Sequence, residues 1–356
     1  MSKRPLPLVS SKMPAGDAGA GGERLFAHGD AATTGRRVTQ ADKRGAQGGP
    51  GGRLNVSPST RRGSRRMRLV RKAITHLLVV IVGLAMFLPF YWILSASVMT
   101  YEEVTAIPPK WMPSTPQWGN YGAVLRDPNV PLFKYFKNSF IVSTAVTAAV
   151  LLTSSLAGYA LAKLKFPGRD AVFTFTLSTM MFPVFLFLIP VYYILKRFPL
   201  LGGNNLFGMG GTGALQSYVS LILPFVVSAW GIFLMRQFMM TIPDELIDAA
   251  RIDGASDLGI FGRVMMPLVK PALATLAIFT FIGQWNYFLW PMIVTTSAPH
   301  LMTVPVGLRL MGTAYSTAVN MNKLLAATVL AIAPSVCVFL ALQRYYIKGF
   351  VLSGFK

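Results

Sequence analysis

Six long apolar segments constrain the fold of this chain more than any other feature. Each holds about 20 residues, the length that an α-helix needs to cross the hydrocarbon core of a bilayer. Lipid offers no hydrogen-bond partner to open backbone, so each spanning segment is expected to be helical. The sequence therefore predicts an all-α, polytopic membrane helix bundle with six transmembrane helices, at about residues 73–98, 139–162, 171–195, 216–235, 272–295 and 324–342.

The composition excludes an ordinary soluble domain. Of the 356 residues, 53% are hydrophobic and 13% are charged, whereas soluble domains carry about 25% charged residues. The single cysteine, Cys337, lies in an apolar run, which indicates a buried, inert thiol. Prolines inside the apolar segments predict kinks that serve packing rather than gating, at Pro89, Pro183, Pro190, Pro224, Pro291 and Pro334.

Basic residues set the expected orientation in the membrane. Residues 1–72 contain 16 Lys and Arg residues and four acidic residues, and the positive-inside rule places such a segment in the cytoplasm. With six spans, the N- and C-termini lie on the same side of the membrane. The loop between the fourth and fifth spans then also faces the cytoplasm.

Residues 1–70 are expected to form a disordered, basic cytoplasmic tail that precedes the membrane domain, residues 71–356. The tail is rich in Gly, Ser, Pro, Ala and Arg and has no sustained apolar period. Its bases nearest the membrane would be attracted to anionic lipid headgroups. No nucleic-acid partner is expected, because no aromatic residue lies between those bases. Translation from Met67 is an alternative start.

The loop between the fourth and fifth spans concentrates the acidic residues. It carries five of the chain's 13 acidic residues within 14 positions, as a docking surface or an ion site would. Asp248 and Arg251 can pair at i, i+3 on a helix. A short helix, a bend and a second helix are indicated by residues suited to a first turn, a left-handed bend and a cap: Pro243, Gly254, and Ser256 or Asp257. We expect one face of the first helix to hold Leu246, Ala249, Ala250 and Asp253.

The chain carries no signature of catalysis, so we expect no catalytic residue, no metal site and no cofactor. It lacks the G-x-x-x-x-G-K-[ST] phosphate-binding loop, and His28, His76 and His300 do not have metal-ligand spacing. An ion-coupled secondary transporter is a rival class, but no Asp or Glu lies well inside any predicted span. A membrane-embedded enzyme would need a reactive cluster, which the sequence does not offer.

The acidic loop resembles the EAA loop of the inner-membrane subunits of bacterial ATP-binding-cassette (ABC) importers. The family pattern is E-A-A-x-x-D-G-A…P-L-x-x-P, and this chain reads DAARIDGAS…PLVKP. Flanking segments such as FIGQWNYFLWPMIV and TVPVGLRL are similar to the carbohydrate branch, in particular the maltose-type second permease, from about residue 70 onward. Asp248 stands in for the usual Glu, and the matching residues are Ala249, Ala250, Asp253, Gly254, Ala255 and Pro267.

The resemblance implies a set of partners and a cargo. The loop would dock in a cleft of an ATP-binding subunit, with Asp248 pairing with a basic residue and Gly254 allowing the bend. The complex would contain a second homologous permease, two ATP-binding subunits and an extracellular or periplasmic solute-binding protein, in the bacterial inner membrane. The cargo would be a sugar or oligosaccharide, with a polyol or glycerol phosphate as the alternative within the family.

A polar group in the fifth predicted span is the candidate substrate contact. Polar residues inside spans tend to face a cavity or a neighbouring helix. The group begins at Gln284 and continues through the next three residues. The family often has W-N-[DE] here, and Tyr287 replaces the acid. The candidates are Trp285, Asn286 and Tyr287. Helix-to-helix packing is the alternative role for Trp285 and Asn286.

Overall fold

The computed structural model describes residues 58–128, 130–314 and 321–353, and these ranges contain helices and no strand. The chain divides into two compact units, Met1–Arg68 and Leu69–Lys356. Most of the predicted basic tail, residues 1–57, lies outside the described residues. Residues 58–70 are the first turns of helix α1.

Three helices are uninterrupted and correspond to the first, second and sixth predicted spans. Their lengths come from long apolar runs without glycine–proline breaks, and Pro89 and Pro334 are accommodated inside two of them. Each contains a stretch that is long and apolar enough to cross a membrane. The helices are α1 (Pro58–Ala96), α4 (Leu132–Lys163) and α15 (Met321–Ser353).

Three further elements are bent helix pairs, and among the described residues they raise the number of candidate spans from three to as many as six. Each bend lies beside at least one proline, which lacks a backbone donor: Pro183 at the first, Pro224 at the second, and Pro267 and Pro271 at the third. The pairs are α5 (Arg169–Thr179) with η1 (Val184–Phe187) and α6 (Leu188–Lys196), bent by 92°; α7 (Tyr218–Ile222) and η2 (Leu223–Phe225) with α8 (Ala229–Met240), bent by 44°; and Asp257–Leu268 with α12 (Lys270–Trp285), bent by 79°.

The predicted boundaries of the fifth span were wrong. Residues 272–295 do not form one helix, because α12 ends at Trp285 and α13 begins at Leu289 (Leu289–Thr295). Two buried tryptophans explain the break. Trp285 donates its indole N–H to the Ala331 carbonyl in α15, and Trp290, which belongs to a different core cluster, donates to the Ser220 carbonyl in α7 at 2.9 Å. The backbone between them turns so that each ring reaches its own core.

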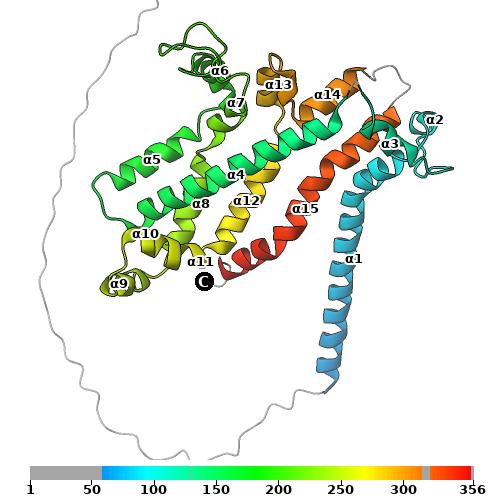
Figure 1. Cartoon of the computed structure of the whole chain (residues 1–356). Coiled ribbons are helices and arrows are strands. Elements are labelled where there is room, and N and C mark those ends of the chain that lie inside the picture. Colours follow the sequence, from blue (N-terminus) through cyan, green and yellow to red (C-terminus); the bar gives the residue numbers. More distant parts are fainter. Residues whose placement is uncertain (1–57, 129, 315–320, 354–356) are drawn as a thin grey trace, which may run out of the picture. The chain divides into compact units, whose positions relative to one another are not determined.

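The packing centre of the bundle is α4, which lies beside α8 and α12, while α12 also contacts α15 (Figure 1). Glycine allows the closest approach. A Cβ atom on Gly158 would lie 2.7 Å from the Met235 Cβ, and one on Gly231 would lie 2.4 Å from the Ser154 hydroxyl. Small residues at such crossings are how membrane helices come together.

The thiol of Cys337 is exposed on α15, so the expectation of a buried thiol was wrong. Apolar residues beside it in the sequence are exposed as well, among them Val336, Phe339 and Leu340. A helix in a bilayer can turn apolar residues to lipid.

The remaining short helices outside the acidic loop are α2 (Tyr101–Val104), α3 (Gly119–Leu125), η4 (Pro299–Leu301) and α14 (Val304–Ala314).

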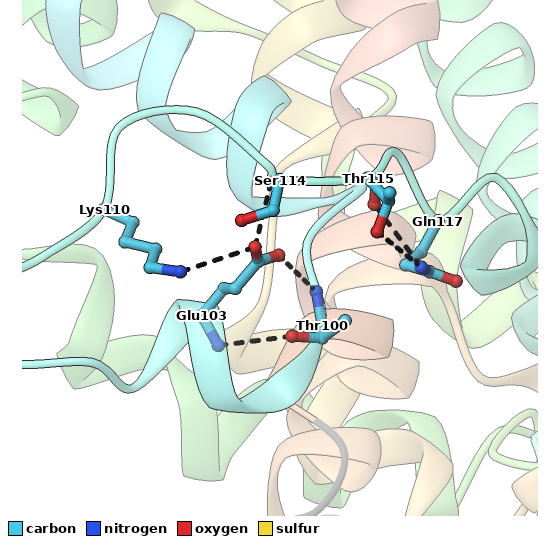
Figure 2. Close-up of polar contacts among 6 residues, drawn as sticks. All are labelled: Thr100, Glu103, Lys110, Ser114, Thr115 and Gln117. Atoms are coloured by element: carbon cyan, nitrogen blue, oxygen red, sulfur yellow. Dashed lines mark hydrogen bonds and ion pairs between the residues drawn. The ribbon is translucent and has the colours of Figure 1, made fainter.

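The segment after α1 is organised around the carboxylate of Glu103 (Figure 2). Thr100 and Glu103 form a reciprocal capping box at the start of α2. The other carboxylate oxygen accepts the Ser114 N–H at 2.9 Å and lies 3.6 Å from Lys110 Nζ. Hydrogen bonds from the hydroxyl and the N–H of Ser114, then from Thr100, with the charge of Lys110, lower the pKa of Glu103 to about 2.

Candidate functional site: the acidic loop and the fifth span

The acidic loop forms a helix, a bend and a second helix, as the sequence predicts. Helix α9 (Glu245–Ile252) is followed, two residues beyond its last residue, by a glycine with a φ of +81°, Gly254. The Ala255 N–H donates to the Ala250 carbonyl at 2.9 Å across this bend, which is how a left-handed glycine closes a helix end. The Ser256 hydroxyl then caps α10 (Asp257–Ile260) by accepting the Gly259 N–H at 3.2 Å.

Pro243 was expected in the first turn of this helix, and that prediction was wrong, because Pro243 precedes the helix. The Asp244 carbonyl accepts the first helical hydrogen bonds, from Ile247 and Asp248, so α9 begins at Glu245, two residues after Pro243. At the far end, a π-helical turn, η3 (Phe261–Met265), and α11 (Met266–Leu268), which contains Pro267, lead to the bend before α12.

The inner face of the loop is anchored in the bundle. Ile247, Ile260 and Met265 are buried in the same core cluster as residues of α4, α8 and α12. Ala250 and Ala255 are half-buried against it. The loop is therefore a packed protrusion rather than a free segment, and a force on it reaches the spans through these side chains.

The outer face of the loop exposes both apolar and acidic side chains. Ile252 is 86% exposed, and Leu258 is also exposed. Sequence reasoning missed both, although apolar residues off the Ile247 face of a polar loop are the signal that could have found them. The predicted docking residues Asp248, Ala249, Asp253, Gly254 and Pro267 are also exposed.

One arginine links the two short helices. Arg251 lies 3.8 Å from the Asp248 carboxylate, which confirms the predicted i, i+3 pair, and 3.3 Å from the Asp257 carboxylate beyond the bend. All three side chains are well exposed, so the energy of these pairs is small. They favour one angle between α9 and α10.

A lysine at the end of α4 holds the start of the loop. Lys163 Nζ donates to the Ile242 carbonyl at 2.6 Å and to the Asp244 carboxylate at 2.5 Å. Its side chain is 5% exposed, whereas that of Asp244 is 76% exposed. The hydrogen bond from Lys163 is the main cause of a lowered Asp244 pKa. This contact ties the loop to α4, the packing centre of the bundle.

A second basic residue braces the neighbouring helices. Arg236 in α8 donates to the Leu161 carbonyl at 3.2 Å, and its guanidinium carbon lies 3.9 Å from the centroid of the Phe173 ring. It also lies 3.5 Å from the Asp170 carboxylate at the start of α5. The ends of α4, α5 and α8 nearest the loop are thereby joined.

The three predicted substrate-contact residues lie in different surroundings. Trp285 is buried between α12 and α15. The Asn286 amide folds back to the Ile282 carbonyl at 2.9 Å, where α12 ends. Tyr287 packs edge-on against Phe225, with 5.2 Å between ring centroids, and lines a cavity.

Across the described residues, no group of three or more His, Cys, Asp or Glu side chains is placed to hold a metal ion.

Comparison with known proteins gives matches to membrane transport components. The family described as "Binding-protein-dependent transport system inner membrane component" matches residues 150–351. The arabinooligosaccharides transport system permease protein AraQ of Bacillus subtilis is 36% identical over 63% of this chain and 74% of its own length. The sn-glycerol-3-phosphate transport system permease protein UgpE of Pectobacterium atrosepticum is 33% identical over 78% of this chain and 95% of its own length.

A solved structure has the same fold. It is a chain of a bacterial ABC transporter involved in the import of the acidic polysaccharide alginate. The TM-score is 0.63 at 25% sequence identity, over 79% of this chain and 98% of that chain.

Proposed function

Because this chain belongs to the family of binding-protein-dependent transport system inner membrane components, we propose that it forms half of the translocation pathway of an ATP-driven importer for a sugar or oligosaccharide. It is a non-catalytic subunit. Its partners are a second homologous permease, two ATP-binding subunits and an external solute-binding protein. Residues 71–356 are the permease domain, residues 1–70 are a basic tail, and both termini are cytoplasmic.

The loop formed by α9, the Gly254 bend and α10 carries this proposal. Its inner face is packed into the bundle at Ile247 and Ile260. Its outer face offers Ile252, Leu258 and acidic side chains to a partner. A surface that is rigid, apolar and acidic fits a basic-rimmed cleft on an ATP-binding subunit.

Coupling then follows from differential binding. ATP binding shifts the membrane bundle only if the ATP-binding subunits hold the loop differently in the two transmembrane states. The loop is suited to transmit that difference, because Lys163 fastens its start to α4. The far end of the loop continues directly into the fifth span, since α11 ends two residues before α12 begins.

The sugar assignment is supported by the relatives together with the site. A permease named for arabinooligosaccharides and a structure named for alginate import are both similar to this chain. A permease named for sn-glycerol 3-phosphate is similar as well, and glycerol phosphate is the second candidate cargo.

A charge placed on the outer face of the loop tests the docking. Ile252→Glu removes an apolar contact from a side chain that is 86% exposed, so it costs the fold little. We expect the tagged chain to lose its ATP-binding subunits on purification from native membranes. Ile107→Glu is the matched control, because Ile107 is 97% exposed in the segment after α1. Full retention of the ATP-binding subunits and of cargo-stimulated ATP hydrolysis in Ile252→Glu would overturn the proposal.

A further inference from the structure

Three interrupted helical elements meet around one cavity of about 400 Å³. Val184 follows the break between α5 and η1, Ser228 lies in the break before α8, and Tyr287 follows the end of α12. All three line the cavity. Its volume is within the range of small-molecule sites, roughly 300–1,000 Å³.

The cavity lies at mid-depth in the bundle. Its α4 wall is formed by Val146 and Val150, which flank the middle of the uninterrupted helix Leu132–Lys163. At membrane depth, non-helical backbone is tolerated only where protein buries it or where it lines a water-filled cavity. Broken helices that converge near the midplane are also where transported solutes bind in other membrane transporters. The three breaks therefore indicate a hydrated site rather than a packing defect.

The wall combines aromatic faces with free polar groups. Two edge-to-face pairs line it: Phe225 with Tyr287, at 5.2 Å between centroids, and Trp230 with Phe279, at 5.6 Å. Thr280 and Gln284 also line it, and neither side chain makes a hydrogen bond within the described residues. Such groups at this depth need water or a ligand hydroxyl as a partner.

No side chain that lines this cavity is ionisable as a cation or a carboxylate. From this, and on the premise of the proposed function, we infer that this wall is a subsite for a neutral glycan and not for a phosphorylated or uronic-acid cargo. The aromatic faces take the C–H surfaces of sugar rings, and Thr280 and Gln284 take the hydroxyls. An anionic cargo would enter this wall without a countercharge, at high desolvation cost.

Gly283 provides a probe of the occupant. A Cβ atom added there meets no atom within 4 Å, and the residue lines the cavity. Gly283→Cys in a Cys337→Ala background places one thiol at the wall. Thr275→Cys in the same background is the matched control, because Thr275 is buried in α12 and close to cysteine in size.

The test measures the rate at which a hydrophilic methanethiosulfonate reagent modifies each thiol in the complex purified from native membranes. We expect Gly283→Cys to react and Thr275→Cys not to react. Neutral arabino- and malto-oligosaccharides should slow the reaction at Gly283→Cys by about tenfold near saturation, and sn-glycerol 3-phosphate and alginate oligosaccharides should not. Two labelling results at Gly283→Cys would overturn the inference: protection by the anionic solutes, and a failure of every neutral saccharide to protect.

An unreactive Gly283→Cys overturns it too, since lipid or a partner helix then covers the wall. ATP-driven uptake by the Cys337→Ala parent separates the outcomes: its absence defeats the proposed function, and its presence with anionic protection defeats only the neutral-glycan subsite.

Discussion

Lys163, at the last turn of α4, places its ammonium group 2.5 Å from the Asp244 carboxylate, 81 residues further along the chain. The same ammonium holds the Ile242 carbonyl at 2.6 Å. Because Lys163 is nearly buried, these bonds satisfy a charge that has little access to water. The acidic loop thus begins at a fixed point on α4, the helix that packs against most of the bundle.

Lys163→Gln should loosen the start of the loop. Hydrogen bonds to charged groups contribute about 1.5–3 kcal/mol, and the exposure of Asp244 puts the expected loss near the low end, about 1–2 kcal/mol. Hydrogen exchange at the α9 amides should therefore accelerate by about tenfold. Lys165→Gln, which changes an exposed lysine two residues away, is the control and should leave the α9 exchange rates unchanged. Equal rates in both variants would contradict the anchoring role of Lys163.

The Glu103 network should weaken in acid. The folded-state pKa, about 2, lies below the ordinary value of 4.5, so its stabilisation is complete above the ordinary value and is lost as the pH falls toward the folded one. Exchange at the Thr100 and Ser114 amides, corrected for intrinsic rates, should accelerate across that interval. Glu103→Gln should show the faster rates throughout and little dependence on pH. A wild-type profile that is flat over the same range would contradict the network.

Gly254→Ala should strain the bend without causing a clash. The glycine has a φ of +81°, and no atom lies within 4 Å of an added Cβ, so the cost is the backbone penalty of about 1–2 kcal/mol. We expect less ATP-binding subunit to co-purify with Gly254→Ala. Gly254→Asn should retain more of it, since asparagine tolerates the left-handed region. The reverse order would show that the bend is not what docking requires.

Substitutions at Trp285 and Tyr287 should have different effects, the first mainly on stability and the second mainly on transport. Trp285→Phe removes the buried hydrogen bond to Ala331 and should lower the melting temperature of the complex, with uptake per folded complex unchanged. Tyr287→Ala removes a ring from the cavity wall and should reduce uptake with a smaller loss of stability. If Trp285→Phe instead changed which solute is carried, the packing role of Trp285 would be wrong.

Local signals made much of this fold predictable. Apolar run length located the three uninterrupted helices, and Gly254 with Ser256 located the bend and the cap of the acidic loop. The break after Trp285 was not predictable, because the run 272–295 stays apolar and the break depends on which cores receive Trp285 and Trp290. The contacts of Lys163 join residues about 80 positions apart, and such contacts leave no local pattern.

The sidedness of the loop is the most direct test of the account. Leu258→Cys in a Cys337→Ala background presents one exposed thiol on the outer face of the loop. A membrane-impermeant maleimide should label it in inverted membrane vesicles and leave it unlabelled in intact right-side-out vesicles. Labelling in the right-side-out vesicles would put the loop out of reach of cytoplasmic ATP-binding subunits and would contradict the importer mechanism.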